Sequence, residues 1–299
     1  MSAIPGFSER RITTKEAELF VATGGSGPPL LLLHGYPETH FCWHRVAPVL
    51  ARSFTIVCPD LRGYGQSRFT GRESDDHAAF AKRAMAADQV ELMAALGHER
   101  FCVAGHDRGA RVAYRLALDH GARVERLALL DIVPTLETFE RMSQASALSA
   151  YHWLFLAQPY DLPERLIGRD PDFYLDWTIK SWCAPGASLA EEAMAEYRRA
   201  FRAPAAIHAA CEDYRAGATL DCANDRADRD AGTRILSPLL VLWGARRRVA
   251  AQAAALGPLD TWRRWASEVE GGPLPCGHFL PEEAPDDVAA ALLGFFTRR

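Results

Sequence analysis

The chain of 299 residues contains only three lysines, no C-x-x-C pair, and no apolar run of the roughly 18 residues that a membrane-spanning helix requires. Its 34 basic residues, nearly all arginine, are outnumbered by 38 acidic ones, so the formal net charge is −4. We therefore expect no binding to nucleic acid or to an anionic membrane. Several of the seven cysteines sit in apolar runs, which is typical of buried thiols in a reducing compartment. Because no basic segment followed by an apolar run begins the chain, we expect a cytoplasmic protein.

Short apolar runs alternate with longer stretches of helical pattern along most of the chain. Uninterrupted apolar runs suit strands that are covered on both faces, as in a parallel sheet. The order therefore predicts an α/β fold with a mostly parallel central sheet flanked by helices. The expected strands are residues 30–33, 54–58, 101–104, 127–130, 239–243 and 271–276, and the expected helices are 82–96, 111–118 and 284–296.

One long segment breaks this alternation. Residues 134–237 contain no clear buried-strand run, only helical patterns rich in Trp, Tyr, Arg and Ala, with turn sequences between them. We predict that this segment is an inserted helical cap (lid) domain, and that residues 1–133 and 238–299 together form the core domain.

The sequence Gly105-His106-Asp107-Arg108-Gly109 directly follows an expected strand and precedes an expected helix. Small residues on either side permit the sharp turn of a nucleophile elbow, which exposes the middle side chain above the sheet. That residue is Asp107, whose carboxylate can form an ester with a saturated carbon bearing a leaving group; water must then hydrolyse the ester. The motif favours alkyl halides or epoxides as substrates over acyl compounds. A helix cap at Asp107 is the structural alternative.

A base that activates water is expected late in the chain. His278 follows an expected strand and precedes the last helix, as this order requires. Residues 244–248 offer no carboxylate to orient it, so we predict Asp131, which ends the strand after the elbow helix. Asp107 and Asp131 would then lie at the same edge of the sheet, where open α/β sheets assemble their sites. Asp260 is the alternative acid, in a stretch of helical pattern.

Two arginines stand beside the expected nucleophile. Arg108 follows it directly and Arg111 lies one helical turn further on, so both guanidinium groups can converge on a small anion. An apolar haloalkane would gain nothing from two buried cations. Ion pairs with carboxylates of the cap are the structural alternative for these arginines.

Hydrogen-bond donors from an early loop and from the cap complete the expected site. The backbone N–H groups of Tyr36 and Arg108 are candidates for an oxyanion hole during ester hydrolysis. Aromatic and imidazole side chains of the cap offer donors that can receive a departing halide, although such side chains more often simply pack into a core. These candidates are Tyr151, His152, Trp153, Trp182 and Tyr214.

Together these motifs resemble those of the fluoroacetate dehalogenases of the α/β-hydrolase superfamily, and the resemblance extends over nearly the whole chain. The stretches that carry it are HGYP (34–37), GHDRGARV (105–112), LDIVP (130–134), YHW (151–153), CEDYR (211–215) and GHFLPEE (277–283). The resemblance implies the α/β-hydrolase fold, with Asp107 as the nucleophile, His278 as the base and Asp131 as its acid partner.

The resemblance also implies how a substrate would be held. Arg108 and Arg111 would clamp its carboxylate, and a halide pocket would consist of His152, Trp153 and Tyr214. It further implies a homodimer that uses no cofactor and no metal. Tyr36 stands where the family commonly has Phe, and Arg246-Arg247-Arg248 fills a loop that we interpret as a solvated face.

We therefore expect a haloacetate dehalogenase that converts small 2-haloacids to 2-hydroxy acids and halide. An epoxide hydrolase of the same fold is the nearest alternative, with Tyr151 and Tyr214 as the paired donors to the epoxide oxygen. Two buried arginines would have no role with a neutral epoxide, which disfavours this reading. A non-catalytic binding protein of the same fold is the other alternative, and the complete set of nucleophile, base and acid disfavours it.

Overall fold

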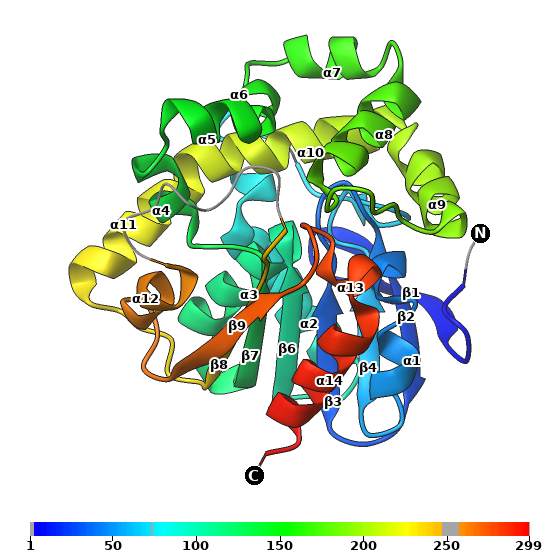
Figure 1. Ribbon diagram of the computed structural model, residues 1–299, viewed down its shortest axis with the longest axis vertical. Helices are drawn as coiled ribbons and strands as arrows, with labels where there is room; N and C mark the ends of the chain where they lie inside the picture. Colours follow the sequence, from blue (N-terminus) through cyan, green and yellow to red (C-terminus); the bar gives the residue numbers. More distant parts are fainter. Residues whose placement is uncertain (1–2, 73, 247–256, 299) are drawn as a thin grey trace.

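The computed structural model describes residues 3–72, 74–246 and 257–298, and within them nine strands form one sheet (Figure 1). The strands are β1 (Ser8–Thr13), β2 (Ala17–Gly25), β3 (Pro29–Leu33), β4 (Thr55–Pro59), β5 (Arg68–Phe69), β6 (Phe101–His106), β7 (Val124–Leu130), β8 (Leu239–Gly244) and β9 (Val269–Leu274). Their order is β1-β2-β4-β3-β6-β7-β8-β9, with β5 beside β2. From β4 to β9 along this order all pairs are parallel, whereas β2 runs antiparallel to its three partners.

The predicted α/β fold with a mostly parallel sheet is confirmed. Each expected strand corresponds to one of β3, β4, β6, β7, β8 and β9, and Leu30 to Leu33 of β3 are fully buried because both faces of the sheet are covered. The N-terminal hairpin of β1 and β2 was not predicted. β1 is a polar edge strand whose side chains are almost all exposed, so it carries no apolar run.

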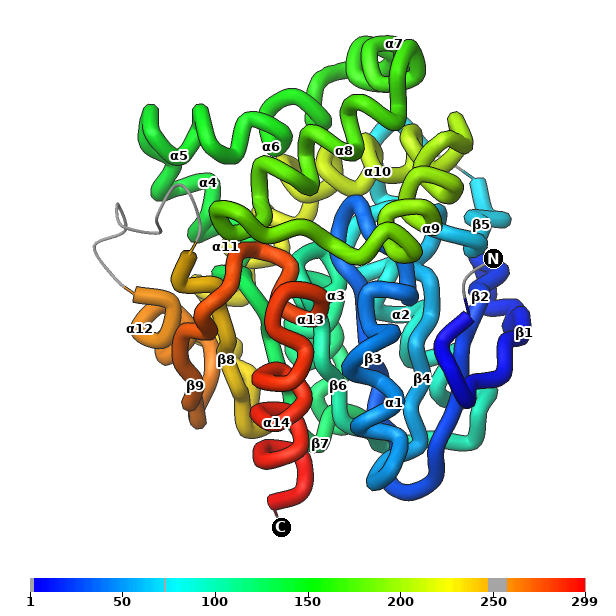
Figure 2. The backbone as a smooth tube through the Cα atoms, turned by 45° about the vertical axis from the view of Figure 1, so that its right-hand side comes forward, coloured from blue at the N-terminus to red at the C-terminus, as the bar shows by residue number. Residues whose placement is uncertain are grey.

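Helices cover both faces of the sheet. α2 (Lys82–Ala95) and α3 (Asp107–Asp119) pack on each other on one face, and α1 (Ala47–Leu50) and α14 (Pro285–Phe296) pack together on the other (Figures 1 and 2). The three predicted helices correspond to α2, α3 and α14. Of the helices formed by the described residues, none combines the length and the hydropathy needed to cross a bilayer.

All elements between β7 and β8 are helical, and the structure describes every residue of this segment. They lie together over the end of the sheet where the parallel strands terminate (Figures 1 and 2). We call residues 134–237 the cap segment. That this segment is a separate domain remains a prediction. Its helices are α4 (Thr135–Glu140), α5 (Gln144–Ser149), α6 (Tyr151–Leu156), α7 (Leu162–Ile167), α8 (Pro171–Trp182), α9 (Glu191–Phe201), α10 (Pro204–Ala216), the π-helical turn η4 (Gly217–Asp221) and α11 (Cys222–Ala231).

Candidate active site

Asp107 is the first residue of α3, directly after β6, and its φ of +45° is one that residues with a side chain rarely adopt. Two glycines allow this turn. A Cβ on Gly109 would lie 2.4 Å from the carbonyl oxygen of His34, and one on Gly105 would lie 2.6 Å from the backbone of Ala110. The turn has the geometry of a nucleophile elbow, at the edge of the sheet that the cap segment covers.

The Asp107 carboxylate is buried and held from one side by the backbone. The N–H of Tyr36 donates a hydrogen bond to Asp107 Oδ2 at 3.2 Å. Burial alone would raise the pKa of Asp107, but the electrostatic interactions with His278, His106, Arg108 and Arg111 outweigh it and hold that pKa well below its ordinary value. Asp107 is therefore ionised at neutral pH, as a nucleophilic carboxylate must be.

His278 lies between β9 and α13 (Leu280–Glu283), with its ring between the two predicted acids. Its Nδ1 is 2.5 Å from Asp131 Oδ2, and the N–H of Gly244 donates to Asp131 Oδ1 at 3.1 Å. Its Nε2 is 3.8 Å from Asp107 Oδ1, which is longer than a hydrogen bond. The contact with Asp131 thus holds the ring so that Nε2 faces the Asp107 carboxylate.

The alternative acid lies elsewhere. Asp260 is on the exposed surface of α12 (Pro258–Arg263), where its carboxylate accepts a hydrogen bond from Arg263 at 2.6 Å. The carboxylate next to His278 is that of Asp131, as the sequence predicts.

Of the three arginines at 246–248, Arg247 and Arg248 lie outside the described residues.

The two arginines beside Asp107 are both buried, and both guanidinium groups stack on Trp153, at 5.5 Å for Arg108 and 4.4 Å for Arg111. Arg108 forms an ion pair with Asp213 of α10, in which its Nε and Nη2 donate to the carboxylate at 3.1 and 2.5 Å. The structural alternative of an ion pair with the cap therefore applies to Arg108. Its Nη1 has no hydrogen-bond partner among the described residues.

Arg111 is held differently. Its Nη1 donates to the carbonyl oxygen of Val133 at 3.1 Å and to the Thr135 hydroxyl at 3.0 Å, whereas its Nε has no hydrogen-bond partner in the described part of the chain. Burial and the neighbouring charge of Arg108 lower the pKa of Arg111. No carboxylate of the described residues forms an ion pair with Arg111, and its charge is one of those that lower the pKa of Asp107.

Four side chains of the cap segment form what we call the aromatic wall: His152, Trp153, Trp182 and Tyr214. The Tyr214 ring lies 5.7 Å from the rings of both His152 and Trp153. Trp182 is 4.3 Å from the ring of His152 and 5.3 Å from that of His278. Burial and the charge of Asp107 raise the pKa of Tyr214 well above its ordinary value, so its phenol remains a donor.

The remaining tyrosines divide between this site and the surface. The Tyr36 ring packs 5.4 Å from that of Tyr214, and 6.1 Å from that of Trp182. Tyr151 instead lines an exposed groove on the cap together with Leu148 and Leu154. The Tyr151 ring also lies 6.1 Å from that of His152, so Tyr151 borders the aromatic wall. The structure therefore brings together the predicted site residues, whereas the alternative acid Asp260 lies elsewhere.

Sequence reasoning assigned no role to three further residues. Asp213 precedes Tyr214 on α10 and binds Arg108, and an acid beside an expected pocket residue was a usable signal for it. His106 lies beside the nucleophile, and its Nδ1 is 2.9 Å from Glu38 Oε2. No local sequence pattern predicts the contact between His106 and Glu38, because the two residues are 68 positions apart in the chain.

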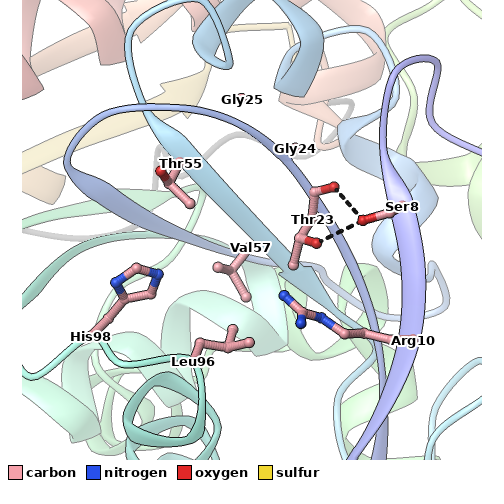
Figure 3. Close-up of a pocket in the computed structure, with 9 residues that line it drawn as sticks. All are labelled: Ser8, Arg10, Thr23, Gly24, Gly25, Thr55, Val57, Leu96 and His98. Atoms are coloured by element: carbon pink, nitrogen blue, oxygen red, sulfur yellow. Dashed lines mark hydrogen bonds between the residues drawn. The ribbon is translucent and has the colours of Figure 1, made fainter.

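A cavity of about 240 Å³ opens at the opposite end of the sheet (Figure 3). Thr55 at the start of β4 lines it, as do Arg10 and His98, and none of its lining residues is acidic. It therefore lies away from the strand ends that carry Asp107 and Asp131. No group of His, Cys, Asp and Glu among the residues that the structure describes could hold a metal ion.

Comparison with known proteins agrees with this architecture. Residues 28–285 match the family model of the α/β hydrolase fold, and the chain belongs to that family. A fluoroacetate dehalogenase from a Burkholderia sp. is 43% identical over 295 residues, which cover 98% of this chain and 94% of that protein. A soluble epoxide hydrolase from Corynebacterium sp. (strain C12) is 36% identical, with 92% of each chain covered. A solved structure from Nostoc sp. PCC 7120, described as an α/β hydrolase, has a TM-score of 0.94 and 48% identity, and covers 99% of this chain and 100% of that one.

Proposed function

We propose that this protein is a haloacetate dehalogenase, which hydrolyses small 2-haloacids to 2-hydroxy acids and halide through an ester on Asp107. The observation that carries the proposal is an ionised aspartate at the nucleophile elbow with the buried charge of Arg111 beside it. An ester on carbon needs such a carboxylate, and a haloacid brings the anion that Arg111 would bind. The similarity to a fluoroacetate dehalogenase, at 43% identity over 98% of the chain, supports it.

In the first step the carboxylate displaces the halide. Because the Tyr36 N–H already binds Oδ2, we assign the attack to Asp107 Oδ1. A new bond forms between Oδ1 and the carbon that carries the halogen, and the carbon–halogen bond breaks with its electron pair leaving on the halide. The N–H and O–H groups of the aromatic wall would receive that halide as its charge develops.

In the second step water hydrolyses the ester. His278 Nε2 takes a proton from a water molecule, whose oxygen adds to the carboxyl carbon of Asp107, and Asp131 stabilises the resulting imidazolium. The negative charge that develops on Oδ2 is met by the backbone N–H groups of Tyr36 and Arg108. The bond from the carboxyl carbon to Oδ1 then breaks, and the hydroxy acid leaves with Oδ1 and a proton from His278. Neither step uses a cofactor or a metal.

Substrate recognition would depend on the two arginines unequally. Arg111 has no carboxylate partner among the described residues and is the main ligand for the substrate carboxylate, whereas Arg108 contributes through Nη1, the nitrogen that Asp213 leaves free. A clamp of this kind selects a small anion over a neutral substrate.

An epoxide hydrolase remains the second candidate, since a relative with that activity is 36% identical over 92% of the chain. Its paired phenols would be Tyr151 and Tyr214, whose rings lie 6.1 and 5.7 Å from that of His152. A non-catalytic binding protein is the third candidate. Halide release from any haloacid would exclude it.

Isotope transfer during a single turnover tests the proposal. With enzyme in excess over chloroacetate in heavy-oxygen water, the label should enter the Asp107 carboxylate and the first product should be unlabelled. Mass spectrometry of the peptide that contains Asp107 measures the transfer. Heavy oxygen in the first product would instead mean direct attack by water, and the proposed mechanism would be wrong.

We further propose that the cap segment acts as a lid domain on the core and that the protein is a homodimer. Large apolar side chains on α5 to α8 are exposed, among them Leu148 (73%), Leu166 (56%) and Phe173 (65%). Leu148 and Leu154 line one contiguous groove that is almost wholly apolar, and a contiguous exposed apolar surface often marks a protein–protein interface. A second copy of the chain, bound through the cap segment, would cover it.

A further inference from the structure

His106 is the last residue of β6 and stands directly before the nucleophile. Its Nδ1 lies 2.9 Å from Glu38 Oε2 and its Nε2 lies 2.7 Å from the backbone oxygen of His278. Neither side chain of the Glu38–His106 pair has any exposed surface. Burying a charged pair carries a desolvation cost. This pair also binds the backbone oxygen of His278, the proposed base, through His106 Nε2.

The partners of His106 define its protonation. A carboxylate and a backbone carbonyl both accept hydrogen bonds, so each ring nitrogen of His106 has to carry a hydrogen, which makes the ring an imidazolium. Although burial lowers the pKa of a histidine, the charge and hydrogen bond of Glu38 outweigh it and raise the pKa of His106 to about 9. The ring of His106 also lies 4.8 Å from the ring of His278.

The pair touches three loops of the site at once. Glu38 lies on the loop after β3 (residues 34–39, the oxyanion loop), which presents the Tyr36 N–H to Asp107. His106 belongs to the elbow, and the carbonyl that it binds belongs to the loop after β9 (residues 275–279, the base loop). These loops pack with no spare room. A Cβ on Gly35 would lie 2.8 Å from both Asp107 Cβ and His106 Nδ1. A shift of His106 would therefore move the oxyanion loop and the base loop together.

We propose that the Glu38–His106 ion pair is a positioning device that fixes the base loop against the nucleophile and the oxyanion loop, and that it serves the hydrolysis of the ester more than its formation. The inference rests on the proposed function. Formation of the ester needs Asp107 and the substrate clamp. Of the four groups that lower the pKa of Asp107, His278, Arg108 and Arg111 remain when the pair is removed. Hydrolysis needs His278 and the Tyr36 N–H, which stand on the two loops that His106 and Glu38 hold.

Rapid-quench kinetics on Glu38→Gln and His106→Asn separate the two steps. Glu38→Gln is the conservative variant, because its amide oxygen still accepts from Nδ1 while the charge is lost. Removal of a general base costs about 10²–10⁴ in rate, so displacing one should slow ester hydrolysis by about tenfold or more. The first-turnover burst of chloride should keep its rate within about threefold, and the ester on Asp107 should accumulate.

His40 and Asp60 provide the matched control. Their hydrogen bond of 2.8 Å joins a histidine and a carboxylate that are equally buried, yet neither binds the base loop. His40→Asn should lower the melting temperature as much as His106→Asn does, while the ratio of the two rates stays at the wild-type value. Equal slowing of both steps in Glu38→Gln, or no slowing of either, would overturn the inference.

Nitrogen NMR gives a readout that does not depend on activity. At pH 7 both ring nitrogens of His106 should show the shifts of protonated imidazole in the wild-type protein. If the wild type forms no ester, the proposed function fails and with it the part of the inference that concerns ester hydrolysis, and this measurement then decides whether the pair is a fixed ion pair. Two protonated nitrogens would then support the pair as a fixed imidazolium–carboxylate, and a neutral ring would overturn it.

Discussion

Arg108 and Asp213 form a buried ion pair across the junction of α3 and α10, with Nε and Nη2 of Arg108 donating to the two carboxylate oxygens at 3.1 and 2.5 Å. The same carboxylate accepts a hydrogen bond from the Tyr64 hydroxyl at 2.7 Å and contacts the ammonium of Lys82. Asp213 thus joins the first turn of the elbow helix to the cap segment. Arg108 has a structural role that Arg111 does not share, and the two arginines should respond differently to substitution.

Replacing Arg111 with Leu removes one charge-assisted interaction with the substrate carboxylate, worth roughly 1.5–3 kcal/mol. At about 1.4 kcal/mol per factor of ten, kcat/KM for haloacetate should fall at least tenfold. The melting temperature should change little, because within the described residues Arg111 forms no ion pair and contacts only neutral groups, namely Val133, Thr135 and the Trp153 ring. Steady-state kinetics and thermal unfolding measure both quantities. An unchanged kcat/KM would make Arg111 structural and revive the epoxide alternative.

Replacing Arg108 with Leu should destabilise the protein more than replacing Arg111 with Leu does. The Asp213 carboxylate would keep its contact with Lys82 but lose both hydrogen bonds from Arg108. Breaking a buried ion pair costs about 3–5 kcal/mol of stability. The melting temperature of Arg108→Leu should therefore fall well below that of Arg111→Leu. Equal melting temperatures would show that the Arg108–Asp213 pair contributes no stability beyond that of the Arg111 contacts.

Replacing His278 with Gln should separate the two chemical steps. Gln cannot take a proton from water, so ester hydrolysis should slow by about 10²–10⁴, while Asp107 still displaces the halide. The expected result is one equivalent of halide per enzyme and a protein whose mass includes the ester. Intact-protein mass spectrometry detects it. An unmodified protein after incubation with chloroacetate would contradict the assignment of His278 to the second step.

Particular residues show what local sequence can and cannot predict. The turn at Asp107 was predictable because its glycines and flanking runs are adjacent in the chain. The placement of His278 beside Asp131 follows from strand ends at one edge of a parallel sheet. The partners of the charged groups were not. Asp213 is 105 residues from Arg108, and the carbonyl that His106 binds is 172 residues away, so only the folded chain specifies those contacts. Strand β1 was not predicted for a related reason. Its polar sequence carries no strand pattern, and it is a strand because it pairs with β2.

The raised pKa of His106 predicts a pH dependence of stability. Its pKa is about 9 in the folded protein against 6.5 for an ordinary histidine, so the folded state binds the proton more tightly. The stabilisation is fully present below about pH 6.5 and is lost as the pH rises through about 9. Over that window the free energy of unfolding should decline by an amount on the order of 3 kcal/mol. Urea unfolding at several pH values measures it.

His106→Asn is the reference for that measurement, because asparagine does not titrate. The groups that face His106 are Glu38, Asp107, His278 and, more distantly, Glu282. Burial and the charge of Glu38 raise the pKa of Glu282 to about 8, and this also lowers stability as the pH rises. Since Glu282 is present in both proteins, the difference between them largely removes its effect. Parallel declines in both proteins would refute a charged His106.

The exposed groove on the cap segment predicts how the proposed dimer can be broken. Leu148→Glu and Leu154→Glu place charges in a groove that is almost wholly apolar, and a charge buried without a partner disfavours association. Light scattering should show a dimer for the wild type and a monomer for the double variant. Leu236→Glu is the matched control, because Leu236 is 80% exposed and does not line the groove. A double variant that remains dimeric would exclude this surface.

The aromatic wall predicts a selective effect on fluoride. Fluoride concentrates its charge on a small atom and leaves poorly, so cleavage of a carbon–fluorine bond depends on donors that meet the charge as it develops. Loss of one well-placed donor typically costs about 10²–10³ in rate. His152→Ala and Tyr214→Phe should therefore reduce fluoride release from fluoroacetate far more than chloride release from chloroacetate. Trp153→Phe removes an indole N–H, keeps an aromatic ring under Arg111, and should act in the same direction.

Trp177→Phe is the matched control for this series. Trp177 is 48% exposed on α8 and packs 5.6 Å from the ring of Tyr151, outside the aromatic wall, so its substitution should leave both rates unchanged. Ion-selective electrodes measure the two halides under the same conditions. Because the donors matter most where the bond is hardest to break, the ratio of the two rates is the decisive quantity. Equal losses on both substrates would mean that the wall only shapes the pocket, and a wild type that releases chloride but no fluoride would restrict the activity to chloro- and bromoacids.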